Sequence, residues 1–235
     1  MKKSYLSLSL AVLLSTLGAS GLRAQENNRK FAFSAEAGVR VATGMAGGGI
    51  SAWAYRGIGS KQKFMVGLGI RQTSHFSRDL EYITAPAEFT SDEKNLDTMK
   101  LSSGSIHSVN LAIDLRYRFS NAFSVGFNID AIGISSGPEQ TGKLSHQNAS
   151  GVRENFSPTA KVTSLNALLI GDNDIGTLNS EFYVSYGFSD QWAAKLSASY
   201  LFTEFTSDKK YIAGIDNDRY RNKSMGLALA LQYRF

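Results

Sequence analysis

The sequence predicts an all-β protein, an eight-stranded antiparallel up-and-down β-barrel that spans a membrane. Three observations lead to this prediction: segments in which apolar residues alternate with small or polar ones, an even number of such segments, and short turns that alternate with long polar loops. Strict alternation places the two kinds of side chain on opposite faces of a strand. Because an open sheet edge does not persist in lipid, the strands must close into a barrel.

One two-faced alternation lies at the end of the chain. Met225, Leu227, Leu229, Leu231, Tyr233 and Phe235 alternate with Gly226, Ala228, Ala230, Gln232 and Arg234. About eleven residues is the length that a tilted strand needs to cross the hydrocarbon core of a bilayer. We therefore predict the last membrane-spanning strand at 225–235.

Seven further segments complete the predicted barrel, at 31–42, 49–56, 63–71, 109–119, 123–131, 178–188 and 192–202. The facing of the strand at 49–56 stays open, because Trp53 and Tyr55 oppose Ala52 and Ala54. In the strand at 109–119, one face carries Asp114, Arg116 and Arg118. Such a face is costly in an apolar core and needs water or ion pairs.

The connections between these strands alternate in length. Short ones are expected at 57–62, 120–122 and 189–191, long polar ones at 74–105, 133–176 and 203–222, and a glycine-rich turn at 44–48. This is the pattern of periplasmic turns and extracellular loops, with both chain ends on the periplasmic side. We interpret 162–170 as a hairpin arm above the membrane, because a ninth spanning strand would move the C-terminus to the outside.

Aromatic residues gather at the strand ends beside the short turns, which is typical of an interfacial girdle. They are Phe64, Tyr117, Phe119, Phe123, Tyr186, Phe188, Trp192, Tyr233 and Phe235. Phe76, Tyr200 and Phe202 would begin the girdle on the other side. A soluble up-and-down barrel is the alternative, but it would turn its apolar face inward and has no reason to ring one end with aromatics.

The N-terminus indicates export. Residues 1–24 have the features of a signal peptide: Lys2 and Lys3, an apolar stretch at 6–17, and a cleavage site near Ala24. An uncleaved anchor helix is the alternative, but this stretch falls short of about twenty apolar residues. Residues 25–235 would then form the barrel domain.

Composition excludes several functions. The chain has no cysteine, which rules out disulfides, thiolate metal sites and thiol nucleophiles. Removing Lys2, Lys3 and Arg23 from the formal +5 leaves +2 on the mature chain. That charge is too close to neutral to predict nucleic-acid binding. The three histidines lack metal-ligand spacing, so no cofactor or metal is expected.

With its signal peptide, eight amphipathic strands and C-terminal Tyr233-Arg234-Phe235, the chain resembles small bacterial outer-membrane β-barrel proteins related to the OmpA transmembrane domain and OmpX. The resemblance covers the whole mature chain and is architectural. It implies a location in the cell outer membrane, insertion by the outer-membrane assembly machinery, and contact with lipid and lipopolysaccharide. We expect a monomer. Proteins of this class carry many functions, so the fold does not select one.

The predicted inward face collects polar residues that form the candidate site. They are Glu36, Arg40, Arg71, Asp114, Arg116, Arg118, Asp130, Glu181, Lys195, Gln232 and Arg234. Side chains just fill the interior of an eight-stranded barrel, and opposite charges there would pair. We favour a locked polar plug; the alternative is a narrow or gated pore. Which residues pair is left open.

One short motif suggests chemistry. His75 and Ser77 lie two apart on one face, with Asp79 and Glu81 just beyond, and these are the parts of a hydrolytic triad. His-x-Ser resembles a motif of outer-membrane lipid A deacylases. Here, however, it lies in the third strand rather than near the C-terminus, and it faces inward. We therefore predict no catalytic residues.

These observations favour a non-enzymatic outer-membrane barrel whose extracellular loops mediate a surface interaction or support envelope integrity. The partner would be lipopolysaccharide, a surface protein or another ligand. One alternative is a small or gated pore for small solutes, and a second is a lipid A-modifying hydrolase. If the loops bind the partner, trimming 80–100 should abolish binding and leave insertion intact.

Overall fold

The computed structural model describes residues 31–90, 96–147, 152–170, 173–212 and 216–235. Eight long strands carry the fold. They are β1 (Phe31–Ala42), β2 (Met45–Ile58), β3 (Phe64–Thr84), β4 (Thr98–Arg118), β5 (Phe123–Ser136), β11 (Leu178–Gly187), β12 (Trp192–Ile212) and β13 (Asp216–Arg234). The predicted signal peptide at 1–24 lies outside the described residues and stays a prediction.

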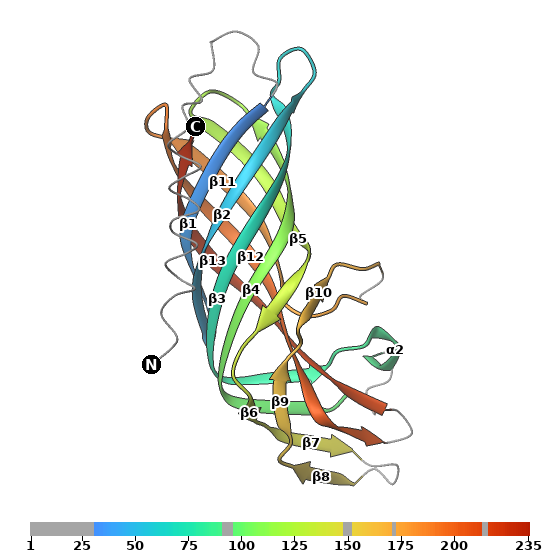
Figure 1. Cartoon of the computed structure of the whole chain (residues 1–235). Coiled ribbons are helices and arrows are strands. Elements are labelled where there is room, and N and C mark those ends of the chain that lie inside the picture. Colours follow the sequence, from blue (N-terminus) through green and yellow to red (C-terminus); the bar gives the residue numbers. More distant parts are fainter. Residues whose placement is uncertain (1–30, 91–95, 148–151, 171–172, 213–215) are drawn as a thin grey trace, which may run out of the picture. The chain divides into compact units, whose positions relative to one another are not determined.

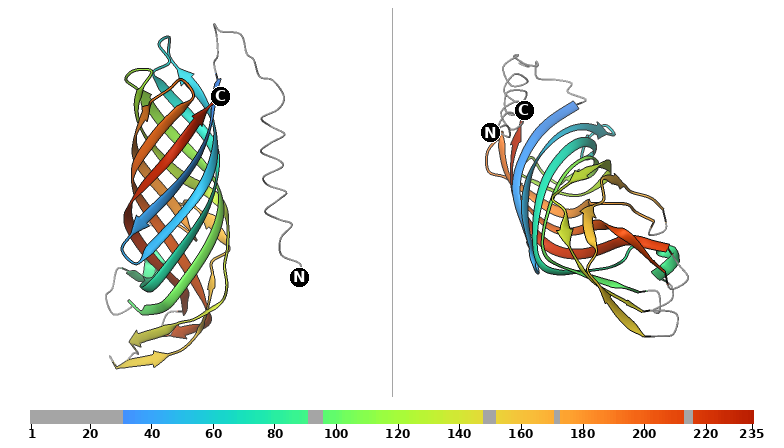
Figure 2. Two further views of the ribbon diagram at one scale, coloured as in Figure 1. Left: turned by 90° about the vertical axis from the view of Figure 1, so that its left-hand side faces the viewer. Right: turned by 60° about the horizontal axis from the view of Figure 1, so that its bottom comes forward.

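The eight strands pair antiparallel in a closed ring. Each pairs with its neighbours in the order β1-β2-β3-β4-β5-β11-β12-β13, and β13 returns to β1, with Gly38 opposite Ala230. Figures 1 and 2 show the tilted strands of this ring. The prediction of an eight-stranded antiparallel up-and-down barrel is confirmed.

The remaining elements are short and follow β3 and β5. They are α2 (Ala87–Thr90), β6 (Gln140–Thr141), β7 (Lys143–Gln147), β8 (Arg153–Phe156), β9 (Thr159–Val162) and β10 (Leu165–Ala167). No helix in the described part of the chain is long and apolar enough to cross a membrane. The short turns β2–β3, β4–β5 and β11–β12 mark one end of the barrel, which we call the turn end; the opposite end is the loop end.

The distribution of polar and apolar side chains is that of a membrane barrel. Val39, Leu68 and Met225 are 62%, 66% and 75% exposed, while the residues between them in the strands face inward. The aromatic residues predicted for the girdle are exposed, except Tyr233 and Phe202, which are half-buried; the Tyr233 ring lies 4.9 Å from that of Trp192. An apolar outer face with aromatics at its edge is what lipid requires of a transmembrane strand. The described residues therefore form a transmembrane β-barrel.

The facing of β2, which the sequence left open, is set by two aromatic residues. Trp53 and Tyr55 point into the barrel and are 3% and 1% exposed. Gly69 and Gly67 lie opposite them on β3. A Cβ at Gly69 would lie 2.3 Å from Trp53 Cε3, and one at Gly67 would lie 2.6 Å from Tyr55 Cε1. The two glycines therefore make room for rings inside the lumen.

The predicted connections at 74–105 and 203–222 are wrong in extent, because the strands continue through most of them. β3 and β4 stay paired out to Ile83 and Thr98, and β12 and β13 stay paired beyond Phe205. The predicted turn at 44–48 is also too long, since β2 begins at Met45. The reason is that these outer parts of the strands no longer separate lipid from a polar lumen, so the alternation used for prediction is lost.

A reversal of facing contributes to this loss. In β3 Arg78 and Asp79 are both exposed, and in β4 Ser102 and Ser103 are both exposed, while the pairing register of the two strands stays the same. Asp79 has a positive φ of 50°. Because two successive residues are exposed, the inward-facing side chains of β3 have odd residue numbers before Arg78 and even numbers after Asp79.

Beyond the reversal, apolar side chains fill much of the barrel interior, beside the buried ion pair of Glu204 and Arg221. The buried residues there form one hydrophobic cluster, which we call the outer core. It consists of Tyr82, Met99, Leu101, Ile106, Leu144, Ala160, Val162, Phe205 and Tyr220. The rings of Tyr82 and Phe205 meet edge to face at 5.2 Å. Burial raises the pKa of the Tyr82 hydroxyl, so it stays neutral.

Strand pairing at the loop end differs from that in the membrane. Above the short β1–β2 turn, β13 pairs directly with β3, with Tyr220 opposite Thr84. The predicted hairpin arm at 162–170 is confirmed only in part: Ala167 pairs with Ile175, but β9 also pairs with β12, and β10 pairs with β5. This segment thus links two strands of the barrel because each half finds a free edge beyond the end of β11.

Candidate functional site

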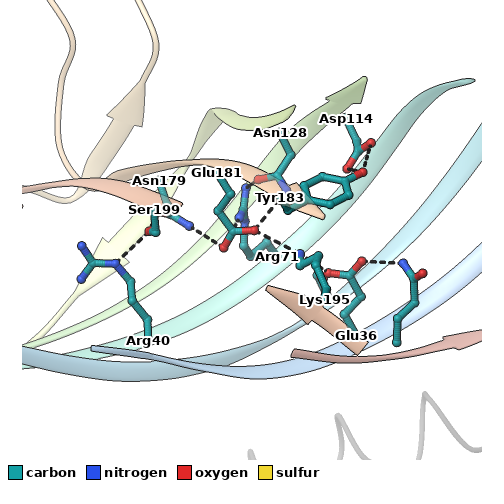
Figure 3. A network of polar contacts seen from close by, with 12 residues as sticks. Glu36, Arg40, Arg71, Asp114, Asn128, Asn179, Glu181, Tyr183, Lys195 and Ser199 are labelled. Carbon is teal, nitrogen blue, oxygen red and sulfur yellow. Dashed lines mark hydrogen bonds and ion pairs between the residues drawn. The ribbon is translucent and has the colours of Figure 1, made fainter. Parts of the chain in front are cut away.

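The centre of the lumen is an ion-paired cluster built from inward positions of three strands. Lys195 on β12 places its Nζ 2.6 Å from Glu36 Oε2 on β1 and 3.0 Å from Glu181 Oε2 on β11. All three side chains are buried. Figure 3 shows Lys195 between the two carboxylates. Gln232 donates to the other oxygen of Glu36 at 2.7 Å.

Arg71 on β3 joins this cluster from the opposite wall. Its guanidinium lies 2.8 Å from Asp130 and 3.5 Å from Glu181, and it donates to Asn128 at 2.9 Å. Asp130 also accepts from the Asn110 side chain at 2.8 Å. Buried charges are stable only when paired and hydrogen-bonded in this way.

Arg116 holds a second branch nearer the turn end. It donates to Tyr55 Oη at 2.6 Å and to Tyr183 Oη at 2.9 Å. Tyr183 in turn donates to Asp114 at 2.8 Å. Arg116 Nη2 lies 3.8 Å from Glu36 Oε1, which connects this branch to the central cluster.

Arg40 reaches the cluster only through neutral groups. Its Nε donates to Ser199 at 2.8 Å, Ser199 donates to Asn179 at 2.7 Å, and Asn179 donates to Glu181 at 3.2 Å. A cavity of about 60 Å³ lies beside Arg40, Arg71 and Lys195, with room for a few water molecules. The lumen is therefore packed rather than open at this level.

Arg118 and Arg234 lie apart from these ion pairs. Both are half-buried at the turn end, and neither has a carboxylate oxygen within 4.0 Å among the described residues. They line a cavity of about 460 Å³ together with Arg116. Hydrogen bonds and ion pairs thus join nine of the ten charged residues predicted for the interior to the network that contains Lys195, with Arg234 joined only through Gln232, whereas Arg118 lies outside it at the mouth.

The His75 and Ser77 motif does not assemble a triad. His75 is 4% exposed, and neither of its ring nitrogens has a hydrogen-bond partner among the described residues. Ser77 Oγ lies 3.5 Å from Tyr82 Oη, while Asp79 and Glu81 are exposed. The hydroxyl and the imidazole are therefore not arranged for nucleophilic attack.

A different serine and histidine meet on the outer surface, which the sequence did not indicate. Ser74 Oγ lies 2.8 Å from His107 Nδ1, and Ser105 Oγ lies 3.3 Å from His107 Nε2. The pair follows from β3–β4 register, which sets Ser74 opposite His107. The second partner of the His107 ring is the Ser105 hydroxyl, whereas a triad needs a carboxylate there to orient the base. The described residues also contain no group of three or more histidine and carboxylate side chains placed to hold a metal.

Fold and site together define the class of protein: a small transmembrane β-barrel with an ion-paired lumen in the membrane and an apolar core beyond it. No protein-family model matches the sequence, and no curated protein matches it.

Several solved structures are similar to the chain at low scores. Ail, the attachment invasion locus protein of Yersinia pestis, is 14% identical, with 87% of this chain and 97% of that chain covered and a TM-score of 0.34. The N-terminal β-barrel domain of Pseudomonas aeruginosa OprF is 12% identical, with 87% of this chain and 97% of that chain covered and a TM-score of 0.35. Neisserial surface protein A is 10% identical, with 89% of this chain and 100% of that chain covered and a TM-score of 0.32. That this chain is a barrel follows from the pairing of its own strands, not from these similarities.

Proposed function

We propose that this chain is a closed, non-enzymatic protein of the bacterial outer membrane whose extracellular β-structure mediates a surface interaction or supports envelope integrity. The observation that carries the proposal is the closure of the lumen in two layers. Lys195, Glu36 and Glu181 fill it within the membrane, and the outer core fills it beyond. A protein that offers no path through its barrel acts through its surface.

The surface that remains is the extracellular β-structure. Its strands β3, β4, β12 and β13 pair far past the apolar belt and enclose the outer core, so this region is ordered by burial of side chains such as Tyr82 and Phe205. An ordered surface binds without the entropy cost of folding a loop. The proposed partner is lipopolysaccharide, a surface protein or another ligand outside the cell.

Location and assembly follow from the same fold. The exposed apolar belt requires a bilayer, and the proposed signal peptide with cleavage near Ala24 supplies export. Among bacterial membranes, β-barrels of this kind belong to the outer one. The outer-membrane assembly machinery would insert the chain, and the closed ring of eight strands lets a monomer stand alone.

Single-channel conductance of the refolded protein in a planar bilayer tests closure. Folding is verified first by the shift in gel mobility between heated and unheated samples. We expect no discrete current steps, because Arg71, Lys195 and their carboxylates occupy the lumen. Reproducible steps from a folded sample would instead support a small or gated pore and reject the closed barrel.

A loop-replacement variant tests the surface role. Replacing 87–96 with a short glycine-serine linker removes α2 and six further residues between β3 and β4. The wider deletion of 80–100 is unsuitable, because Tyr82 and Met99 belong to the outer core. The variant is introduced into cells that lack the native gene, and sensitivity to bile salts and binding of purified lipopolysaccharide are measured. Wild-type behaviour in both assays, with normal insertion, would reject a role for this loop.

The absence of enzymatic activity is tested by the mass of lipid A. We expect identical lipid A spectra from cells that express the wild type, His75→Ala or Ser74→Ala, because neither serine–histidine arrangement has a carboxylate to orient its base. A mass change that depends on either residue would establish the lipid A-modifying hydrolase.

A further inference from the structure

The turn end of the barrel opens into a basic cavity that the closed-lumen function does not use. It has a volume of about 460 Å³, and Arg116, Arg118 and Arg234 line it. Serine hydroxyls and the Asn121 amide share its wall, and Asp190 is the one carboxylate residue in the lining. The guanidinium groups of Arg118 and Arg234 thus border this space without a carboxylate oxygen within 4.0 Å among the described residues, and Arg116, which is bound to Tyr55 and Tyr183, lies at its inner end.

The two outer arginines keep most of their hydrogen-bonding capacity. Arg118 donates to the Gln62 carbonyl at 3.2 Å, and Arg234 donates to the Asn121 carbonyl at 3.3 Å and to Gln232 Oε1 at 3.4 Å. A guanidinium has five N–H donors in a planar fork. Deeper in the lumen, by contrast, Lys195 and Arg71 each contact two carboxylates.

The opposite wall of the cavity makes space for Arg234. A Cβ at Gly187 would lie 2.9 Å from Arg234 Nη1 and 3.5 Å from its Cζ. The glycine at the end of β11 therefore lets the guanidinium lie across the strand. A side chain at this position would force the guanidinium to move.

We propose that this mouth, the space lined by Arg116, Arg118 and Arg234, binds a phosphate group. Guanidinium forks match the oxygens of phosphate in geometry as well as charge. The cavity is large enough for a phosphate ester, and Phe33, Phe188 and Phe235 of its rim are exposed to the membrane interface. The phosphate is that of a phospholipid headgroup or a free anion, and both present the same chemistry to the three arginines.

Calorimetric titration distinguishes the two sources. The refolded protein in maltoside micelles is titrated with inorganic phosphate in one arm and with dihexanoyl phosphatidylglycerol in the other. Arg118→Gln/Arg234→Gln should weaken binding at least about tenfold, because each lost charged hydrogen bond costs that much or more. Binding of both probes identifies a general phosphate site, and binding of the lipid alone identifies a headgroup site.

Arg56→Gln is the matched control. Arg56 is an exposed arginine near the same end of the barrel, packed over the Phe31 ring outside the mouth. It should leave both affinities within about twofold of the wild type. Equal losses in the control and the double variant would show nonspecific attraction and overturn the proposal, as would failure of the wild type to bind either probe.

Gly187→Ala provides a second route if the double variant fails the gel-shift test for folding. It preserves all three positive charges and displaces only the Arg234 guanidinium. We expect weaker binding of the same probe with unchanged folding. Wild-type affinity in this variant, combined with wild-type affinity in Arg118→Gln alone, would overturn the mouth as the binding site.

Discussion

Lys195 Nζ lies 2.6 Å from Glu36 Oε2, although the two residues are 159 positions apart and their strands β12 and β1 are separated by β13. The contact therefore spans the inner surface of β13 rather than joining two paired strands. Glu181 completes the bridge from β11. The Lys195–Glu36 ion pair thus connects two strands that do not pair with each other, whereas the Lys195–Glu181 pair reinforces the pairing of β12 with β11.

Lys195→Met is expected to destabilise the barrel by about 3–5 kcal/mol, because it leaves Glu36 and Glu181 without their shared cation. Urea unfolding in lipid vesicles, followed by tryptophan fluorescence, measures the loss. Lys63→Met, in an exposed position beside a short turn, is the control and should unfold like the wild type. Equal stability of the two variants would show that the bridge contributes nothing.

Phe205→Ala should loosen the outer core without expelling the protein from the membrane. A buried phenylalanine truncated to alanine costs about 3–5 kcal/mol, and Phe205 is fully buried against Tyr82. Limited proteolysis of intact cells should therefore cleave the extracellular region faster, while the gel shift of the barrel persists. Ile83→Ala, an exposed residue of the same region, should resist protease like the wild type.

Gly69→Val tests the space reserved for Trp53. The new side chain would overlap the indole ring, and overpacking of this kind costs about 1–3 kcal/mol. Ala54→Val, on the lipid-facing side of β2, adds the same bulk where there is room. If Gly69→Val folds with wild-type stability and unchanged tryptophan emission, the ring does not occupy the place described.

Asp79→Val should destabilise the strand reversal in β3. Its φ of 50° lies in the left-handed region, where a β-branched residue is strained by about 1–2 kcal/mol. Asparagine tolerates this conformation, so Asp79→Asn is the control. The urea midpoints of the two variants should differ, and equal midpoints would contradict the strained conformation at this position.

The sequence predicted the membrane part of the fold because lipid imposes a strict pattern. Between Phe64 and Arg71, for example, every second residue faces lipid, and the predicted strand agrees with β3. It did not predict the outer half of β3, because Tyr82 and Met99 bury apolar side chains inside and the facing reverses at Asp79. Alternation of polar and apolar residues predicts a strand and its facing only where the two faces of the sheet contact different environments.

The residues of the lumen were predicted, but not their partners. Facing alone placed Glu36, Lys195 and Arg116 inside, whereas the pairs depend on how eight strands are staggered around the ring. The same stagger separates Arg118 and Arg234 from every carboxylate of the network. It also sets Ser74 beside His107, residues that no spacing in the sequence connects.

The pairing of β13 with β1 has a consequence for biogenesis. The ring is completed by the last residues of the chain, where the Phe235 amide donates to the Phe33 carbonyl at 3.1 Å. Without β13, the facing edges of β1 and β12 lack their partners, and lipid does not tolerate either edge. A chain without this strand is therefore expected to fail to fold rather than to form a smaller barrel.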